Sequence, residues 1–212
     1  MIKNNEVALI IGIRGSGKST LTKYFSDTFD RVIIFDRLKE HHDEYIISNL
    51  AQFQSYWHKF HEQESFKFII QLQSAKNDEL FQSEINEILN IIYETGFRKN
   101  RAGIPQNTTL LVFEELQFFC TPYSIIPSLK ECILTGRHAN ITLIANTQRP
   151  ANIHGDFKGN AHHLFAGQLI HKSDINYLKE SILGDDAAKC LTIAKYHFLY
   201  KSHDHPLTIV RI

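Results

Sequence analysis

The stretch GIRGSGKST, Gly12 to Thr20, combines glycines, a lysine and hydroxyls at a spacing suited to phosphate binding. The glycines let the backbone curl so that successive N–H groups point at one anion, and a helix starting there adds its positive dipole end. Lys18 would reach the β- and γ-phosphates of a nucleoside triphosphate, and the Ser19 hydroxyl would coordinate Mg²⁺. The sequence therefore predicts a Walker A loop that binds ATP and Mg²⁺.

Every fixed position of the pattern G-x-x-x-x-G-K-[ST] is met, and Thr20 adds a second, weaker hydroxyl. The alternative is a glycine-rich turn that merely joins a strand to a helix, which does not explain a lysine and a hydroxyl at this spacing. The predicted nucleotide-binding residues of the loop are Gly12, Arg14, Gly15, Ser16, Gly17, Lys18, Ser19 and Thr20.

Two adjacent carboxylates, Glu114 and Glu115, end the apolar run of TLLVFEEL, Thr109 to Leu116. This is the shape of a Walker B strand, which delivers one acid to the Mg²⁺ shell and a second to the attacking water. By position, Glu114 takes the metal role and Glu115 the catalytic role. Because Glu114 stands where Asp is usual, its contact with the metal is open between a direct bond and one through water. A chance pair of acids is the alternative, and the upstream Walker A loop argues against it.

A polar residue, Gln148, follows the apolar run ITLIAN, Ile141 to Asn146. At the tip of a strand next to Walker B, its amide can hydrogen-bond the γ-phosphate or the attacking water. We therefore predict that Gln148 senses the state of the nucleotide. The alternative is an ordinary strand-ending turn before Pro150.

The composition places the chain among soluble globular proteins. Hydrophobic residues make up 43% and charged residues 22% of the sequence, and the formal net charge is zero. Overall charge therefore names no partner, and any contact with nucleic acid needs a local concentration of Lys and Arg. The three cysteines lack C-x-x-C spacing, which favours reduced, buried thiols in an intracellular protein. No apolar stretch approaches the length of a membrane span or a signal peptide, so we expect a cytoplasmic location.

Histidines occur in pairs, at His41-His42, His162-His163 and His203-x-His205. None has a cysteine or acidic companion at zinc-ligand spacing, so solvated turns are favoured over metal ligation.

Strands and helices must alternate to bring these residues together. Short apolar runs predict buried strands, helical spacing predicts the segments between them, and 212 residues suffice for one α/β domain over residues 1–212. The central sheet is expected to be mostly parallel and flanked by helices, with a closing strand pair, YHFLYKS and PLTIVRI. The other predicted strands are Val7 to Ile11, Arg31 to Asp36, Phe66 to Leu72, Thr109 to Leu116, Ile141 to Asn146 and His163 to Ile170. The predicted helices are Leu21 to Phe29, Ser48 to Phe60, Asn77 to Phe97 with Gly96 as its stop, Pro127 to Thr135, and Lys172 to Leu183 with Ser173 as N-cap.

Two charged features are open between a functional and a structural reading. Asp36, at the carboxyl end of its strand, faces either the nucleotide or its own loop as a cap. Arg98, Lys99 and Arg101 are the densest positive charge in the sequence and are expected in a loop after Gly96. This loop is either a solvated turn or a contact with a DNA backbone or a neighbouring subunit.

Four blocks of the sequence together resemble the FtsK/HerA superfamily of DNA-pumping ATPases. The blocks are GIRGSGKST, VIIFDRLKE, LLVFEEL and GRHANITLIANTQRP. The resemblance implies a RecA-like P-loop NTPase fold and a homo-oligomeric ring, a pentamer or hexamer, that hydrolyses ATP to move double-stranded DNA. A chain of this size without an anchor is similar to the genome-packaging ATPases of tailless, membrane-containing double-jelly-roll viruses. That similarity implies a capsid or portal partner, and a place in the host cytoplasm or at the virion vertex.

The resemblance also implies an arginine finger, which reaches the γ-phosphate in the neighbouring subunit. Arg137 falls at the family's position for this residue, just before the sensor strand. Arg149 is the alternative, and for either residue a salt bridge remote from phosphate is the structural reading.

Two other classes of protein use the same loop. A small P-loop kinase would need an arginine-rich lid, and few arginines follow Gln148. A filament-assembly or secretion ATPase of the same superfamily is expected to have a transmembrane segment.

Overall fold

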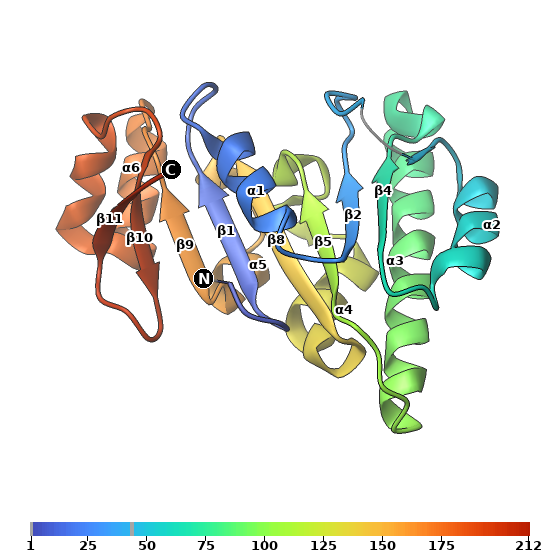
Figure 1. Cartoon of the computed structure of the whole chain (residues 1–212). Coiled ribbons are helices and arrows are strands. Elements are labelled where there is room, and N and C mark those ends of the chain that lie inside the picture. The colour runs from blue at the N-terminus through green and yellow to red at the C-terminus, as the bar shows by residue number, and fades with distance from the viewer. Residues whose placement is uncertain (1, 43–44) are drawn as a thin grey trace.

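The computed structural model describes residues 2–42 and 45–212. Within them the strands form a nine-stranded sheet in the order β11-β10-β9-β1-β8-β5-β2-β4-β3, and β6 pairs with β7 in a small hairpin (Figure 1). The strands from β9 to β3 run parallel, whereas β10 is antiparallel to both β9 and β11. The prediction of a mostly parallel sheet with a C-terminal strand pair is confirmed.

Most strands and helices lie where the sequence predicts them. The strands are β1 Val7–Ile11, β2 Arg31–Phe35, β3 Tyr45–Ile47, β4 Phe66–Ile70, β5 Thr109–Phe113, β6 Cys120–Thr121, β7 Ser124–Ile125, β8 Ile141–Thr147, β9 His163–Ala166, β10 His197–Ser202 and β11 Thr208–Arg211. The α-helices are α1 Lys18–Ser26, α2 Leu50–Phe60, α3 Asp78–Arg101, α4 Pro127–Thr135, α5 Gly155–Asn160 and α6 Lys172–Leu178. Short 3-10 segments include η2 Leu116–Phe118 and η3 Gly136–Ala139.

Both faces of the sheet are buried, which explains why the parallel strands read as continuous apolar runs. In β1, Ala8 and Ile10 pack with Leu21 and Phe25 of α1, which covers the near face in Figure 1. Leu9 points to the other face, where residues of α2 to α6 form the larger core. Burying Leu21 or Phe25 contributes about 1.5–3 kcal/mol each, so this packing holds α1 against the strand that precedes it.

The predicted helix stop at Gly96 is wrong, because α3 continues to Arg101. Gly96 lies where α3 crosses η3, and a Cβ built on it would stand 2.2 Å from the Ala139 carbonyl oxygen. The glycine therefore permits a close helix contact and does not end the helix. The helix ends at Ala102, whose N–H donates to the carbonyls of Arg98 and Asn100.

The basic residues expected in a loop consequently lie in the last turn of α3. Arg98 pairs with Glu94 at 3.4 Å, and the Arg101 guanidinium lies over the Phe97 ring at 5.8 Å. Lys99 approaches Glu62 after α2 at 3.8 Å, and its side chain is only 19% exposed. Three charges on the terminal turn of a helix also complement its negative dipole end.

Two predicted helix starts need correction. Helix α6 begins at Lys172 with His171 as its N-cap, so Ser173 is not the cap. Helix α2 begins after Asn49, whose side chain accepts a hydrogen bond from the Gln52 N–H at 2.9 Å. Asn is as good a cap as Ser, and the position depends on where the chain leaves β3.

Several other elements end earlier than predicted. Helix α1 ends at Ser26 rather than Phe29, β9 ends at Ala166 rather than Ile170, and α6 ends at Leu178 rather than Leu183. The strand β3 and the β6-β7 hairpin were not predicted.

All three cysteines fall within the described residues, and each is buried as a free thiol. Burial raises the pKa of Cys190 to about 11, which keeps that thiol protonated. Over residues 2–42 and 45–212, none of the helices combines the length and the apolar character needed to cross a membrane.

The contact at Gly96 predicts an asymmetric response to alanine. Gly96→Ala should lower the free energy of unfolding by about 1–3 kcal/mol, because the new methyl group meets the Ala139 backbone, which cannot rotate away. Gly159→Ala in α5 is the matched control, since a Cβ there meets nothing within 4 Å. Urea unfolding of both variants measures the difference, and equal stability would show that α3 and η3 separate easily.

Candidate active site

The Walker A loop is held at the carboxyl edge of the sheet, between the ends of two strands. Strand β1 pairs with β8 and β9, and the Gly12 N–H donates to the Thr147 carbonyl at 3.1 Å. The next amide, of Ile13, donates to the Gln168 carbonyl at 2.8 Å. These bonds continue the parallel ladder into the loop, so its entry is fixed by the sheet.

The exit of the loop becomes the amino end of α1. Gly17 is the N-cap with φ 107°, a left-handed conformation that a side chain would strain. A Cβ there would also lie 2.6 Å from the Tyr196 ring. Because glycine offers no side-chain cap, the N–H groups in the first turn of α1 are available to an anion.

A cavity of about 400 Å³ opens over this helix end. The predicted loop residues Arg14, Gly15, Gly17, Lys18, Ser19 and Thr20 line it together with Leu38, Glu40, Glu115, Gln148, Lys195 and Tyr196. The structure thus brings the Walker A loop, the second Walker B acid and the predicted sensor to one cavity. Ser16 lies beneath, with its buried hydroxyl oxygen unpartnered within the described part of the chain.

Lys18 is buried at the base of this cavity. Its ammonium donates to the Ile13 carbonyl at 3.3 Å, so the side chain bends back over the loop. Burial lowers the pKa of Lys18, while the charges of Glu115 and Glu114 oppose that shift. A buried cation whose near partner is a carbonyl is suited to receive a phosphate charge.

Glu115 projects into the cavity from an unusual backbone conformation. Its φ of 54° is left-handed, and its N–H donates to the Asn146 side-chain oxygen at 2.9 Å. Its carboxylate accepts from the Gln148 amide at 2.6 Å and from the Gln117 amide at 2.8 Å. The predicted base and the predicted sensor are therefore directly hydrogen-bonded.

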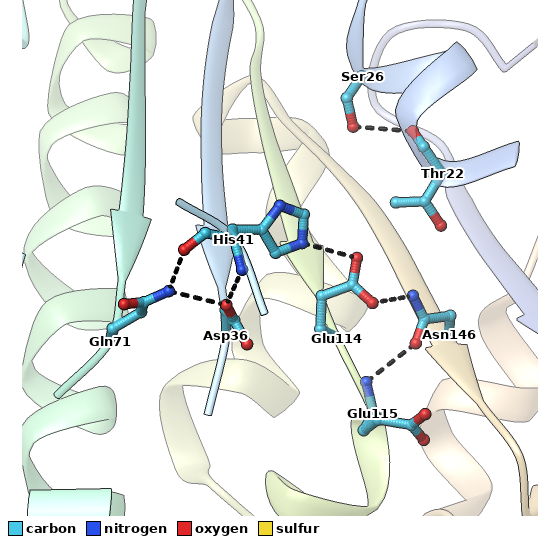
Figure 2. Close-up of polar contacts among 8 residues, drawn as sticks. All are labelled: Thr22, Ser26, Asp36, His41, Gln71, Glu114, Glu115 and Asn146. Atoms are coloured by element: carbon cyan, nitrogen blue, oxygen red, sulfur yellow. Dashed lines mark hydrogen bonds and ion pairs between the residues drawn. The ribbon is translucent and has the colours of Figure 1, made fainter. Parts of the chain in front are cut away.

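Glu114 lies on the other side of the backbone, in a smaller cavity of about 70 Å³ that Ser19 also lines. Figure 2 shows the two carboxylates pointing in different directions, with Asn146 beside both. Glu114 accepts a hydrogen bond from the Asn146 amide and lies 3.4 Å from the His41 ring nitrogen. The hydrogen bond between His41 and Glu114 raises the pKa of His41, although burial opposes this shift.

Asp36 takes the loop-capping position rather than a place in the cavity lining. It is buried, and one carboxylate oxygen accepts from the His41 N–H and from the Gln71 amide, both at 2.9 Å (Figure 2). The loop that it stabilises carries Leu38 and Glu40 to the nucleotide cavity. The role of Asp36 is thus to shape the loop.

Arg137 and Arg149, the two candidates for the arginine finger, have different surroundings. Arg149 lies 3.0 Å from the fully buried Asp174 carboxylate, which matches the salt-bridge reading. Arg137 is exposed on η3, which precedes β8, whereas Gln148 follows β8. The seven residues of β8 span about 23 Å, so Arg137 lies at the far edge of the sheet from its own chain's cavity.

Sequence reasoning missed Leu38, Glu40, Lys195 and Tyr196 in the cavity wall. Tyr196 has a left-handed φ of 63°, and its N–H donates to the Ser16 carbonyl at 3.0 Å, which docks the C-terminal segment on the Walker A loop. The Lys195 ammonium lies over the Tyr196 ring at 4.7 Å. Their positions depend on contacts between distant parts of the chain, and no local pattern in the sequence signals them.

The oxygen donors around Ser19 fit Mg²⁺. Ser19 lines both cavities, with Glu115 in the larger and Glu114 in the smaller. Mg²⁺ usually binds through one or two carboxylates together with substrate phosphates. In the part of the chain that the structure describes, no group of three or more His, Cys, Asp or Glu side chains could hold a metal ion. The donor set therefore suits a metal that arrives with a nucleotide.

Neither a protein-family model nor a curated protein matches the sequence. Solved structures do match over almost the whole chain. The genome-packaging NTPase B204 of Sulfolobus turreted icosahedral virus 2, in complex with sulfate, is 17% identical with a TM-score of 0.73, covering 99% of this chain and 98% of that one. The same NTPase in complex with ATP-gammaS is 20% identical with a TM-score of 0.72, covering 98% and 97%. VirB4 of Thermoanaerobacter pseudethanolicus is 11% identical with a TM-score of 0.68, covering 97% and 88%.

The chain has their P-loop NTPase fold. The likeness confirms the predicted P-loop NTPase fold. In this fold the loop after β1 and the ends of β5 and β8 share one edge of the sheet, which is where ligands collect in open α/β sheets.

The surroundings of the two arginines predict different effects on stability. Arg149→Ala should lower the free energy of unfolding by about 1–3 kcal/mol, because Asp174 is left as an unpaired buried carboxylate. Arg137→Ala should stay within about 0.5 kcal/mol of the parent, since its side chain is exposed. Urea unfolding at neutral pH measures the free energy of unfolding of both variants. An unchanged value in Arg149→Ala would show that the salt bridge between Arg149 and Asp174 does not stabilise the fold.

Proposed function

We propose that the protein is an ATPase that drives the movement of double-stranded DNA, most specifically the packaging of a viral genome. The observation that carries the proposal is the single cavity in which the Walker A loop faces the Glu115–Gln148 pair. A phosphate cradle opposite a hydrogen-bonded carboxylate and amide suits phosphoryl transfer to water.

Each residue has a role in this proposal. The Gly12 to Ser19 loop and Lys18 bind the phosphates of ATP, and Glu115 accepts a proton from the attacking water. Gln148 orients that water and senses the γ-phosphate. Ser19 and Glu114 would hold Mg²⁺, and the metal would supply positive charge near the β- and γ-phosphates.

Genome packaging is favoured over other DNA-moving tasks by the likeness to B204. The likeness to this genome-packaging NTPase, in its sulfate complex, covers 99% of this chain and 98% of B204. The likeness to VirB4 supports a secretion ATPase as the second candidate. A small kinase would need an arginine-rich lid. Among the described residues that line the cavity, Arg14 is the only arginine, so a kinase is disfavoured.

We also propose an oligomeric form, partners and a location for the protein. The working form is a homo-oligomeric ring, a pentamer or hexamer, around double-stranded DNA, with a capsid or portal protein as its further partner. It acts in the host cytoplasm or at the virion vertex. Arg98 and Arg101 are candidate contacts with DNA or a neighbouring subunit, whereas Lys99 is mostly covered.

ATP turnover stimulated by double-stranded DNA tests the function. Lys18→Ala should weaken both ATP binding and turnover, because Lys18 contacts phosphate in the ground and transition states. Glu115→Gln should keep ATP bound while turnover falls about 10²- to 10⁴-fold. Released phosphate and the affinity for a fluorescent ATP analogue are the two measurements, with exposed Lys59→Ala as the control.

Each unexpected result would contradict a different part of the proposed function. Equal turnover in Glu115→Gln and wild type contradicts the catalytic role of Glu115. ATP turnover that DNA leaves unchanged contradicts the DNA-moving function, and phosphate transfer to a small molecule instead of water identifies a kinase.

Arg137 is expected to act on the cavity of a neighbouring subunit. It is exposed and lies at the far edge of its own sheet, so it can reach a γ-phosphate only in trans. Arg137→Ala should bind ATP normally and hydrolyse it about 10³- to 10⁵-fold more slowly. Mixing it with Glu115→Gln should restore activity, since a mixed interface pairs an intact Glu115 with an intact Arg137.

The matched control is a mixture of Arg137→Ala with the Glu115→Gln, Arg137→Ala double variant. No interface in those rings contains both groups, so activity should stay low. No recovery in the first mixture, with mixed rings shown to form, would mean that Arg137 does not act in trans.

A further inference from the structure

The backbone of Glu115 needs something to hold it. Strand β5 ends at Phe113, and the regular alternation of side chains breaks two residues later at the left-handed Glu115 (φ 54°, ψ 69°). This conformation crowds the Cβ of any residue other than glycine and persists only where the surroundings enforce it. It also turns the Glu115 side chain into the nucleotide cavity, while Glu114 remains on the α1 side.

Asn146 of β8 supplies the constraint. Its side chain is fully buried, and its oxygen accepts the Glu115 N–H at 2.9 Å. Its amide nitrogen donates to the Glu114 carboxylate. Figure 2 shows this amide spanning the two neighbouring residues, so one side chain bonds both Walker B positions at once.

The chemistry of the bridge requires asparagine. A carboxylate at position 146 could still accept the Glu115 N–H, but it would face the Glu114 carboxylate without a proton to donate. An apolar side chain of the same shape would leave both the N–H and the Glu114 oxygen unpaired in a buried site. The amide alone has an acceptor and a donor on its two ends.

Glu114 is itself held in place, so the bridge has a firm anchor. Its second oxygen faces the His41 ring at 3.4 Å, and the His41 backbone is bonded to Asp36 and to Gln71. These contacts come from the ends of β2 and β4. The same loop carries Leu38 and Glu40 into the larger cavity, so the anchor and the wall of that cavity belong to one segment.

We propose that Asn146 is a positioning residue, which holds the Glu115 backbone in its left-handed conformation through a hydrogen-bonded bridge to Glu114. The inference rests on the proposed ATPase function for its effect on turnover, and on the structure for its effect on the Glu115 amide. Because Asn146 is buried and does not itself line the nucleotide cavity, its loss should slow the chemical step and leave ATP affinity unchanged.

The test reverses the polarity of the bridge. Asn146→Asp keeps the acceptor for the Glu115 N–H but sets two carboxylates against each other. Glu114→Gln alone keeps an oxygen that accepts from Asn146. In the Asn146→Asp, Glu114→Gln double variant, Gln at position 114 donates to Asp at position 146, so the bridge is restored with its donor and acceptor exchanged.

Amide hydrogen exchange at Glu115, followed by NMR, is the first measurement. We expect a protected Glu115 amide in wild type, Glu114→Gln and the double variant, and faster exchange by about 10-fold or more in Asn146→Asp, as for a locally opened bond. Single-turnover ATP hydrolysis is the second measurement. It should fall about 10- to 100-fold in Asn146→Asp, with unchanged ATP affinity, whereas the double variant should equal Glu114→Gln alone, because Glu114→Gln also removes the carboxylate proposed to bind Mg²⁺.

The outcomes separate the positioning role from the proposed function. Wild-type protein that hydrolyses no ATP defeats the proposed function, while Glu115 exchange still decides the role of Asn146. Equal protection in Asn146→Asp and wild type, or a Glu115 amide that exchanges as fast in the double variant as in Asn146→Asp, overturns the inference. If Asn146→Asp alone does not fold, a folded double variant with a protected Glu115 amide supports it, and failure of both to fold while Glu114→Gln folds overturns it.

Discussion

The pairing of β1 with β8 on one side and β9 on the other is the constraint on which the nucleotide cavity depends. In this register Ile11 lies opposite both Thr147 and Ala166, so the Walker A loop leaves the sheet beside Gln148 and Gln168. A shift of β8 by two residues would move Gln148 by about 7 Å along the sheet, beyond hydrogen-bonding reach of Glu115. A shift of one residue would turn the apolar side chains of β8 to the wrong faces.

The carboxyl edge gathers charged groups that a buried site accepts only when they are paired. Lys18, Glu114, Glu115 and Asp36 are all less than 10% exposed. Each of the three carboxylates accepts at least one hydrogen bond from an amide N–H group, although one oxygen of Asp36 is buried without a partner, and Lys18 donates to a backbone carbonyl. This leaves Lys18 as the group whose charge is least compensated by a direct partner, and a phosphate would supply that compensation. The local electrostatics therefore favour an occupied cavity.

The two adjacent acids show how a backbone conformation separates functions along a sequence. A regular strand would place Glu114 and Glu115 on opposite faces of the sheet, one beneath α1 and one in the core. The left-handed turn at Glu115 instead directs its carboxylate toward Gln148 and Gln117 at the edge. Glu114 remains beside Ser19, where a metal role is open to it, and Asn146 ties the two positions together. The two neighbouring carboxylates thus lie in separate cavities.

The sequence by itself determined the order of the elements and the chemical groups of the site. Short apolar runs such as VALII are typical of strands buried on both faces, and a Walker A loop between a strand and a helix implies where the phosphate lies. Lys18, Glu115 and Gln148 were recognisable because their motifs are local. The helix stop predicted at Gly96 was wrong because the prediction used local sequence only. A glycine near the end of a helical pattern normally marks a stop, and no neighbouring residue indicates the contact of Gly96 with Ala139.

Only the tertiary structure decided how these groups meet. The Glu115–Gln148 and Glu115–Asn146 hydrogen bonds join residues 33 and 31 positions apart, and they exist because β5 and β8 are neighbours in one register. The docking of Tyr196 on Ser16 and the burial of Asp174 against Arg149 likewise follow from the folded path of the chain. Periodicity and motif spacing describe which face of an element is buried, whereas strand order and register decide which side chains touch, and those depend on the packing of the whole sheet.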